Sequence, residues 1–250
     1  MSDSDSESYS LESALLRAAL ATDLAALRRA LATDVTVDPD QRSPGELAAA
    51  LRIIIDTGSP LTITSQTTAS NEVRLQCIEV LLDAGASPNV LDLYAPLTLA
   101  AARGNTAIVN RLLRAGADPK YANPLTGWSA IHAAVFVGSV SCATALVKAG
   151  ADLEAVWTGH TPLLAAVHYR QERMCPILLR GGARLDLDLM AEQFDRTPFY
   201  LQKVEYAGGW KKYEQAHRKR LTTTFAKGFP RLPVDAISHM VDFAFHVGFY

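Results

Sequence analysis

Histidine and cysteine are the side chains of this chain that could bind a metal or act as nucleophiles. Zinc sites hold such residues at short, fixed spacings. Here they are scattered without such a spacing, at Cys77, Cys142, Cys175, His132, His160, His168, His217, His239 and His246. We therefore expect no metal ligands and no cofactor. The three cysteines, an odd number in apolar helical patterns, are predicted to be reduced thiols in a core.

The sequence also lacks the local motifs on which common catalytic sites are built. It has no phosphate-binding Gly-x-x-x-x-Gly-Lys loop, no Gly-x-Gly-x-x-Gly turn, no His-Glu-x-x-His and no Gly-x-Ser-x-Gly elbow. Aspartate and glutamate are distributed over helical faces and connectors, and local spacing brings no pair together for acid–base chemistry. We predict that the protein has no catalytic residues and is not an enzyme.

Composition and charge further restrict the class of protein and the partners it could bind. Apolar residues make up 49% of the chain, and 24 basic residues stand against 26 acidic ones, so a sizeable core can form while electrostatics favours neither nucleic acid nor a membrane surface. No run approaches the roughly 18 apolar residues that span a bilayer. Residues 1–10 are acidic and serine-rich and are predicted to be a disordered tail. With reduced thiols, this favours an intracellular protein, cytoplasmic or nuclear, that is a monomer on its own.

A Gly-Ala pair follows a leucine- or valine-rich segment at four places in the sequence. The pairs recur every 31 to 34 residues, at Gly85-Ala86, Gly116-Ala117, Gly150-Ala151 and Gly182-Ala183. Each glycine stands where a helix must end, and glycine enters the left-handed conformation of such an end without steric cost. The pattern predicts four equivalent helix ends.

A second landmark follows each of these Gly-Ala pairs at a similar offset. It reads Ala95-Pro96-Leu97, Ser129-Ala130-Ile131-His132, Thr161-Pro162-Leu163 and Thr197-Pro198-Phe199. A Ser or Thr, followed in most copies by Pro, is typical of a helix N-cap and first helical residue. Each unit is therefore predicted to be a helix, a turn, a second helix and an extended connector.

A period of about 33 residues with these marks resembles the ankyrin repeat. The resemblance implies an all-α solenoid of helix-turn-helix repeats with hairpin-like connectors. We expect about six repeats over residues 11–228, the outer ones degenerate, with an inserted loop near residues 58–70 and a C-terminal helical segment at 229–250. Only His132 keeps the histidine of the family motif, so we expect apolar stacking to supply most of the stability.

The resemblance implies a non-enzymatic scaffold or interaction module that binds a partner protein or peptide. In that family the partner contacts the concave groove and the connectors, called fingers. Carried over residue by residue, the corresponding positions are Tyr94, Arg103, Trp128, Phe136, Val137, His160, His168, Tyr169 and Arg196, with Leu125 and Trp157 nearby on the fingers. Aromatic residues and arginine are enriched at binding hot spots. An alternative stays open for Trp128 and Phe136, which could instead pack between repeats.

Two C-terminal segments allow other functions. Lys211, Lys212, Arg218, Lys219 and Arg220 form a basic cluster that could touch phosphate or act as a nuclear import signal. Apolar residues three or four apart in the same segment favour a helix with its basic side chains in water, so we expect no nucleic-acid partner and no membrane.

Residues 229–250 combine Pro233 as a helix start with an apolar face. This pattern predicts a helix that covers the end of the solenoid. The alternative is an F-box-like or SOCS-box-like tail, which would make the protein a substrate adaptor of a ubiquitin ligase.

Overall fold

The computed structural model describes residues 14–33, 44–56, 71–89, 95–193 and 199–246. The chain divides into two compact units, Met1–Asp152 and Leu153–Tyr250, each of which is treated by itself below. The predicted tail at residues 1–10 and the predicted inserted loop near residues 58–70 lie outside the described residues.

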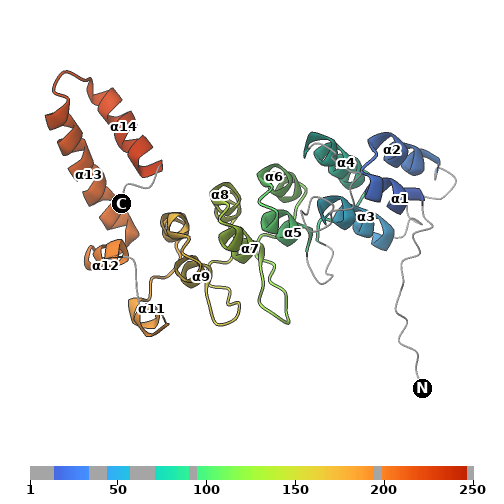
Figure 1. Cartoon of the computed structure of the whole chain (residues 1–250), viewed down its shortest axis with the longest axis horizontal. Coiled ribbons are helices and arrows are strands. Elements are labelled where there is room, and N and C mark those ends of the chain that lie inside the picture. The colour runs from blue at the N-terminus through green and yellow to red at the C-terminus, as the bar shows by residue number, and fades with distance from the viewer. Residues whose placement is uncertain (1–13, 34–43, 57–70, 90–94, 194–198, 247–250) are drawn as a thin grey trace. The chain divides into compact units, whose positions relative to one another are not determined.

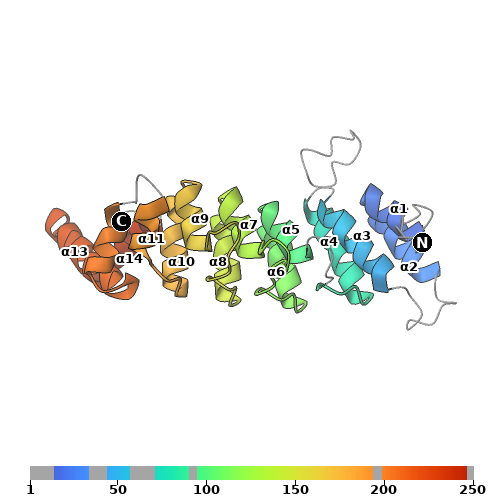
Figure 2. The same cartoon turned by 90° about the horizontal axis from the view of Figure 1, so that it is seen from below.

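Unit 1 consists of four successive helix pairs (Figures 1 and 2). The helices are α1 (Ala14–Ala21), α2 (Leu24–Thr33), α3 (Pro44–Asp56), α4 (Asn71–Asp83), α5 (Pro96–Ala102), α6 (Thr106–Arg114), α7 (Ala130–Val137) and α8 (Val140–Lys148). The first helices of the pairs contact one another in the order α1, α3, α5, α7, and the second helices contact one another in the order α2, α4, α6, α8. The unit is thus two layers of helices with one core between them.

Unit 2 continues the helix-turn-helix pattern and ends in a long hairpin. It contains α9 (Pro162–His168), a short 3-10 helix (Glu172–Met174), α10 (Cys175–Gly181), α11 (Leu187–Gln193), α12 (Phe199–Tyr206), α13 (Trp210–Gly228) and α14 (Val234–His246). Pro176 lies in the first turn of α10, where its missing N–H leaves no helical bond unmade. Helix α13 contacts α10, α12 and α14.

The helix ends follow the sequence prediction closely. All four glycines of the Gly-Ala pairs have positive φ, between +86° and +102°. At Gly116, its N–H donates to Leu113 and the N–H of Ala117 donates to Leu112, the paired bonds of a Schellman cap. The alanine that follows each glycine is buried. The predicted all-α ankyrin-repeat fold is confirmed: the described part of the chain has isolated antiparallel bridges in two connectors and no extended strand.

The N-terminal landmarks have two different outcomes. Thr161 is the N-cap of α9, since its Oγ1 accepts a hydrogen bond from the N–H of Leu164. Ser129 occupies the same place before α7, yet its hydroxyl forms no cap and lies 2.8 Å from Nδ1 of His132 instead. Ser129 is therefore the N-cap residue of α7 by position, but its side chain does not cap the helix, because a buried imidazole competes for its hydroxyl.

A network of ion pairs around Glu214 joins three helices of unit 2, α10, α13 and α14. Glu214 of α13 accepts hydrogen bonds from Arg180 of α10 at 3.0 Å, from Arg218 at 3.2 Å and from the indole N–H of Trp210 at 2.9 Å. Arg218 also pairs with Asp242 of α14. The expectation that every basic residue of this segment lies in water is wrong for Arg218, because α14 brings Asp242 within reach.

This environment also sets the ionisation of Glu214. Burial opposes the charged form, but the hydrogen bonds and positive charges of Arg180 and Arg218 outweigh burial and lower the pKa of Glu214 below its ordinary value. Because the folded-state pKa lies below the unfolded one, the stabilisation is present above the ordinary pKa and is lost as the pH falls through the lowered value.

We expect Glu214→Gln to lower the free energy of unfolding at pH 7 by about 1–2 kcal/mol, since a neutral amide weakens two charge-assisted hydrogen bonds. The difference from wild type should shrink as the pH falls below the ordinary pKa of glutamate and through the lowered pKa of Glu214. Urea unfolding at pH 7 and at a series of lower pH values measures it. Glu205→Gln, on the exposed face of α12, is the matched control; an effect of equal size in that variant, or one independent of pH, would contradict the assignment.

Candidate functional site

A row of three aromatic rings lies on one face of α7 in unit 1. It consists of Trp128, which lies just before the helix, and of His132 and Phe136 within it. The ring of Trp128 stacks on that of His132 at 6.2 Å between centroids and meets that of Phe136 edge-on at 6.1 Å. Their spacing of four residues places them on the same side of the helix. His132 is 1% exposed, whereas Phe136 is 51% exposed and Val137 is 45% exposed. The row therefore extends from the buried ring of His132 to the solvent-exposed ring of Phe136, next to the exposed Val137.

Ser129 fixes the buried ring. Its hydroxyl lies 2.8 Å from Nδ1 of His132, and both side chains are buried. Burying an imidazole nitrogen without a partner would cost free energy, so this bond holds the ring plane against which Trp128 stacks. Ser129 is a positioning residue for the aromatic row.

The connector before α7 forms a finger with a defined turn. The N–H of Asn123 donates to the carbonyl of Trp128 at 2.9 Å. The Asn123 side-chain oxygen accepts from the N–H groups of Leu125 and Thr126. These bonds hold Leu125 at the tip with 92% of its surface exposed. An apolar side chain on an ordered turn loses little conformational entropy when a partner covers it.

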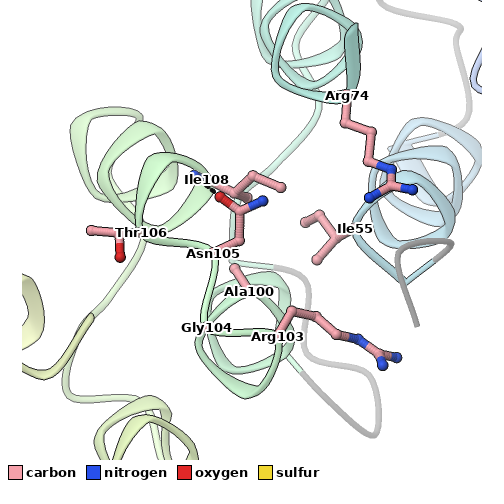
Figure 3. A pocket seen from close by; sticks show the side chains of 8 residues that line it. All are labelled: Ile55, Arg74, Ala100, Arg103, Gly104, Asn105, Thr106 and Ile108. Carbon is pink, nitrogen blue, oxygen red and sulfur yellow. Dashed lines mark hydrogen bonds between the residues drawn. The ribbon is translucent and has the colours of Figure 1, made fainter. Parts of the chain in front are cut away.

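Arg103 has a different environment from the aromatic row. It is the C-cap residue of α5 and pairs with Asp56 at the end of α3. Together with Arg74 of α4 it lines a cavity of about 230 Å³ (Figure 3). Its neighbour Gly104 lies against Val137: a Cβ built on Gly104 would be 3.6 Å from Cγ1 of Val137.

Unit 2 has a second aromatic cluster at the finger before α9. Trp157 and His160 exchange backbone hydrogen bonds of 3.0 and 2.9 Å, with Thr158 and Gly159 both at positive φ between them. This is the geometry of a tight hairpin turn. The Trp157 ring stacks on Tyr169 at 6.3 Å, and His160 and His168 lie 5.0 Å apart between ring centroids. His168 is exposed and its ring meets that of Tyr169 edge-on.

The sequence-derived binding residues thus fall into separate groups. Trp128, Phe136 and Val137 share the α7 face of unit 1, and His160, His168 and Tyr169 share the α9 cluster of unit 2. Arg103 belongs to the cavity, and Tyr94 and Arg196 lie outside the described residues. Sequence reasoning missed Arg74 and Asp56, because nothing in their local pattern distinguishes them from ordinary helix-surface charges.

Two further kinds of site, a metal site and a membrane span, concern the described side chains and helices. In that part of the molecule, no three His, Cys, Asp or Glu side chains gather as metal ligands. None of the described helices has the length and apolarity needed to cross a bilayer. The thiol of Cys175 is buried, and burial raises its pKa to about 11, which leaves it protonated and a poor nucleophile at neutral pH.

Comparison with known proteins shows that part of the chain matches a family of repeat proteins. Residues 97–191 match the family model described as ankyrin repeats in three copies. The chain is 36% identical over 129 residues to the nuclear factor NF-kappa-B p105 subunit of Gallus gallus, covering 49% of this chain and 13% of that protein.

Two further relatives match over comparable lengths. The probable E3 ubiquitin-protein ligase XBOS31 of Oryza sativa subsp. japonica is 33% identical over 102 residues, 40% of this chain and 23% of that protein. The B-cell lymphoma 3 protein homolog of Mus musculus is 30% identical over 138 residues, 52% of this chain and 30% of that protein. The chain thus spans less than a third of the length of each relative.

We expect Ser129→Ala to lower the free energy of unfolding by about 1–3 kcal/mol, because it leaves Nδ1 of the buried His132 without its hydroxyl partner. Chemical denaturation measures the loss. Thr144→Ala, which removes an exposed hydroxyl bonded to a carbonyl within α8, is the control and should stay within about 0.5 kcal/mol of wild type. Equal stability of the two variants would show that Ser129 does not hold His132.

Proposed function

We propose, from the premise that the chain belongs to the ankyrin-repeat family, that it is a non-enzymatic module that binds a segment of a partner protein through its fingers and first-helix faces. Ankyrin repeats generally mediate interactions between proteins. The proposal therefore concerns which surface of this chain is used and what kind of segment it takes.

The observation that carries the proposal is the exposure of Phe136, Val137 and Leu125 in one repeat. Large apolar side chains in solvent gain free energy when a partner covers them, at about 25 cal/mol per Å². Two of them lie at the end of α7 beside the aromatic row, and the third is held at the tip of the preceding finger. An ordered apolar surface of this kind favours a segment with apolar side chains of its own.

The α9 cluster supports the same function in unit 2. Trp157, Tyr169 and His168 combine ring faces with polar edges, the chemistry that is enriched at binding hot spots. The cluster lies at the same place in its repeat as Trp128 and Phe136 do in theirs, at the finger and the first helix.

An adaptor for a ubiquitin ligase is a second candidate function, suggested by the C-terminal tail and by the name of one relative. It requires the apolar face of α14 to be free for a second protein. Ile237 and Val241 of that face are buried, and α14 packs on α13. This packing favours the simple binding module.

The test is quantitative affinity capture from a cell extract with wild type and Leu125→Ala/Phe136→Ala as baits. We expect a partner whose recovery falls at least about 10-fold with the double variant, because hot-spot truncations cost 2 kcal/mol or more. Both side chains are half or fully exposed, so thermal unfolding should change little.

Tyr206→Ala is the matched control. Tyr206 is a large exposed aromatic on α12, outside both clusters, and its removal should leave the captured proteins unchanged. Identical recoveries with all three baits, with the double variant still folded, would refute the α7 surface as a binding site.

A further inference from the structure

The cavity beside α5 has features that apolar packing does not explain. It is open to solvent on one side and is lined by the ends of four helices of unit 1: the C-terminal ends of α3 and α5, the first turn of α4 and the start of α6 (Figure 3). Its polar lining comes from Arg74, Arg103, Asn105 and Thr106, and Ile55 and Ile108 supply apolar contacts.

Two buried donors in this lining are unsatisfied. The Nε atoms of Arg74 and of Arg103 are both buried, and neither has a hydrogen-bond partner within the described part of the molecule. A buried donor that stays unpaired lowers the stability of the fold, because it has lost its hydrogen bonds to water. Both side chains extend toward the end of α3, where Ile55 lies (Figure 3).

The charges around the cavity also do not balance. Two guanidinium groups line it, and Asp56, which pairs with Nη2 of Arg103, is the one carboxylate recorded against them in the described residues. Asp56 is half exposed and does not itself line the cavity. The N-terminal turns of α4 and α6 add partial positive charge, which the C-terminal ends of α3 and α5 offset. Among the side chains that the structure describes, one of the two guanidinium charges therefore has no counter-charge.

We infer that this cavity binds one oxyanion, a carboxylate or phosphate group, between Arg74 and Arg103. Guanidinium N–H groups match the geometry of such anions and form strong charge-assisted hydrogen bonds with them. A volume of about 230 Å³ is several times the roughly 30 Å³ of one water molecule, so a polyatomic anion has room. A water could satisfy an N–H group but would leave the charge unbalanced.

The anion could be a free ion or the side chain of a bound segment. If the proposed function holds, the position of the cavity favours an acidic side chain of the partner, because the α5–α6 turn at Gly104 lies close to the exposed Val137. The anion site itself does not depend on that function and is tested on the protein alone.

The decisive variant is Arg74→Met, which keeps the length of the side chain and removes the charge and the unpaired donor. In anion-poor buffer we expect it to be at least as stable as wild type, since it relieves like-charge repulsion with Arg103. Sodium phosphate should then raise the Tm of wild type by roughly 2–4 °C in a saturable way and leave that of the variant unchanged. An arginine with a purely structural role would give a variant that is less stable in every buffer.

Arg111→Met is the matched control. Arg111 of α6 is a half-buried arginine of the same unit that pairs with Glu79 and Asp83 of α4. This variant should lose stability in every buffer and keep the gain from phosphate. A parallel Tm measurement in sodium chloride at the same ionic strength distinguishes anion binding from charge screening, because screening acts on all exposed charges alike.

Sodium acetate and phosphate are compared as probes to identify the anion. Saturable stabilisation by both supports a site that accepts carboxylates, and stabilisation by phosphate alone supports a site for phosphate groups. The inference is overturned if neither anion acts beyond chloride, or if Arg74→Met responds as wild type does. These outcomes do not depend on affinity capture, so the anion site and the proposed function can fail separately.

Discussion

Alanine at the facing positions of the first helices lets neighbouring repeats of unit 1 approach closely, and the rest of the unit depends on this contact. Ala100 and Ala101 of α5 and Ala133 and Ala134 of α7 are all fully buried, and α5 contacts α7. Small side chains allow helix axes to lie near each other, while leucines of the second helices fill the space behind them. No single helix pair could bury these faces alone, so stability comes from neighbours.

Stacking also fixes the fingers through one hydrogen bond that recurs in each unit. In unit 1 the side chain of Asn89 accepts from the N–H of Asp118 at 2.8 Å. In unit 2 the side chain of Glu154 accepts from the N–H of Arg184 at 2.8 Å. Both acceptors stand four residues after their Gly-Ala glycine, and both donors stand two residues after the next one. The repeat period thus sets the finger positions as well as the helices, and apolar tips such as Leu125 are presented on an ordered framework.

The sequence predicts those features that local conformation controls. The glycines at positive φ, the Thr161 cap and the helix pairs follow from steric preference and from apolar periodicity, and the family resemblance supplies the order of the helices. Features that depend on which side chains meet in space were not predictable. Ser129 has the type and position of a cap, but the buried His132 takes its hydroxyl. Arg218 looks like a solvated charge until α14 folds back and brings Asp242 to it.

The same distinction separates the two kinds of candidate site. The α7 and α9 surfaces could be located from the repeat register, because equivalent positions of successive repeats share one side of the fold. The Arg74–Arg103 cavity could not, since its residues come from the ends of four helices that only packing brings together. A stack held by buried alanine and leucine does not need two buried guanidinium nitrogens that lack partners among the described residues, and their cost persists only if something offsets it. An anion offsets both the missing hydrogen bonds and the charge, which water cannot do.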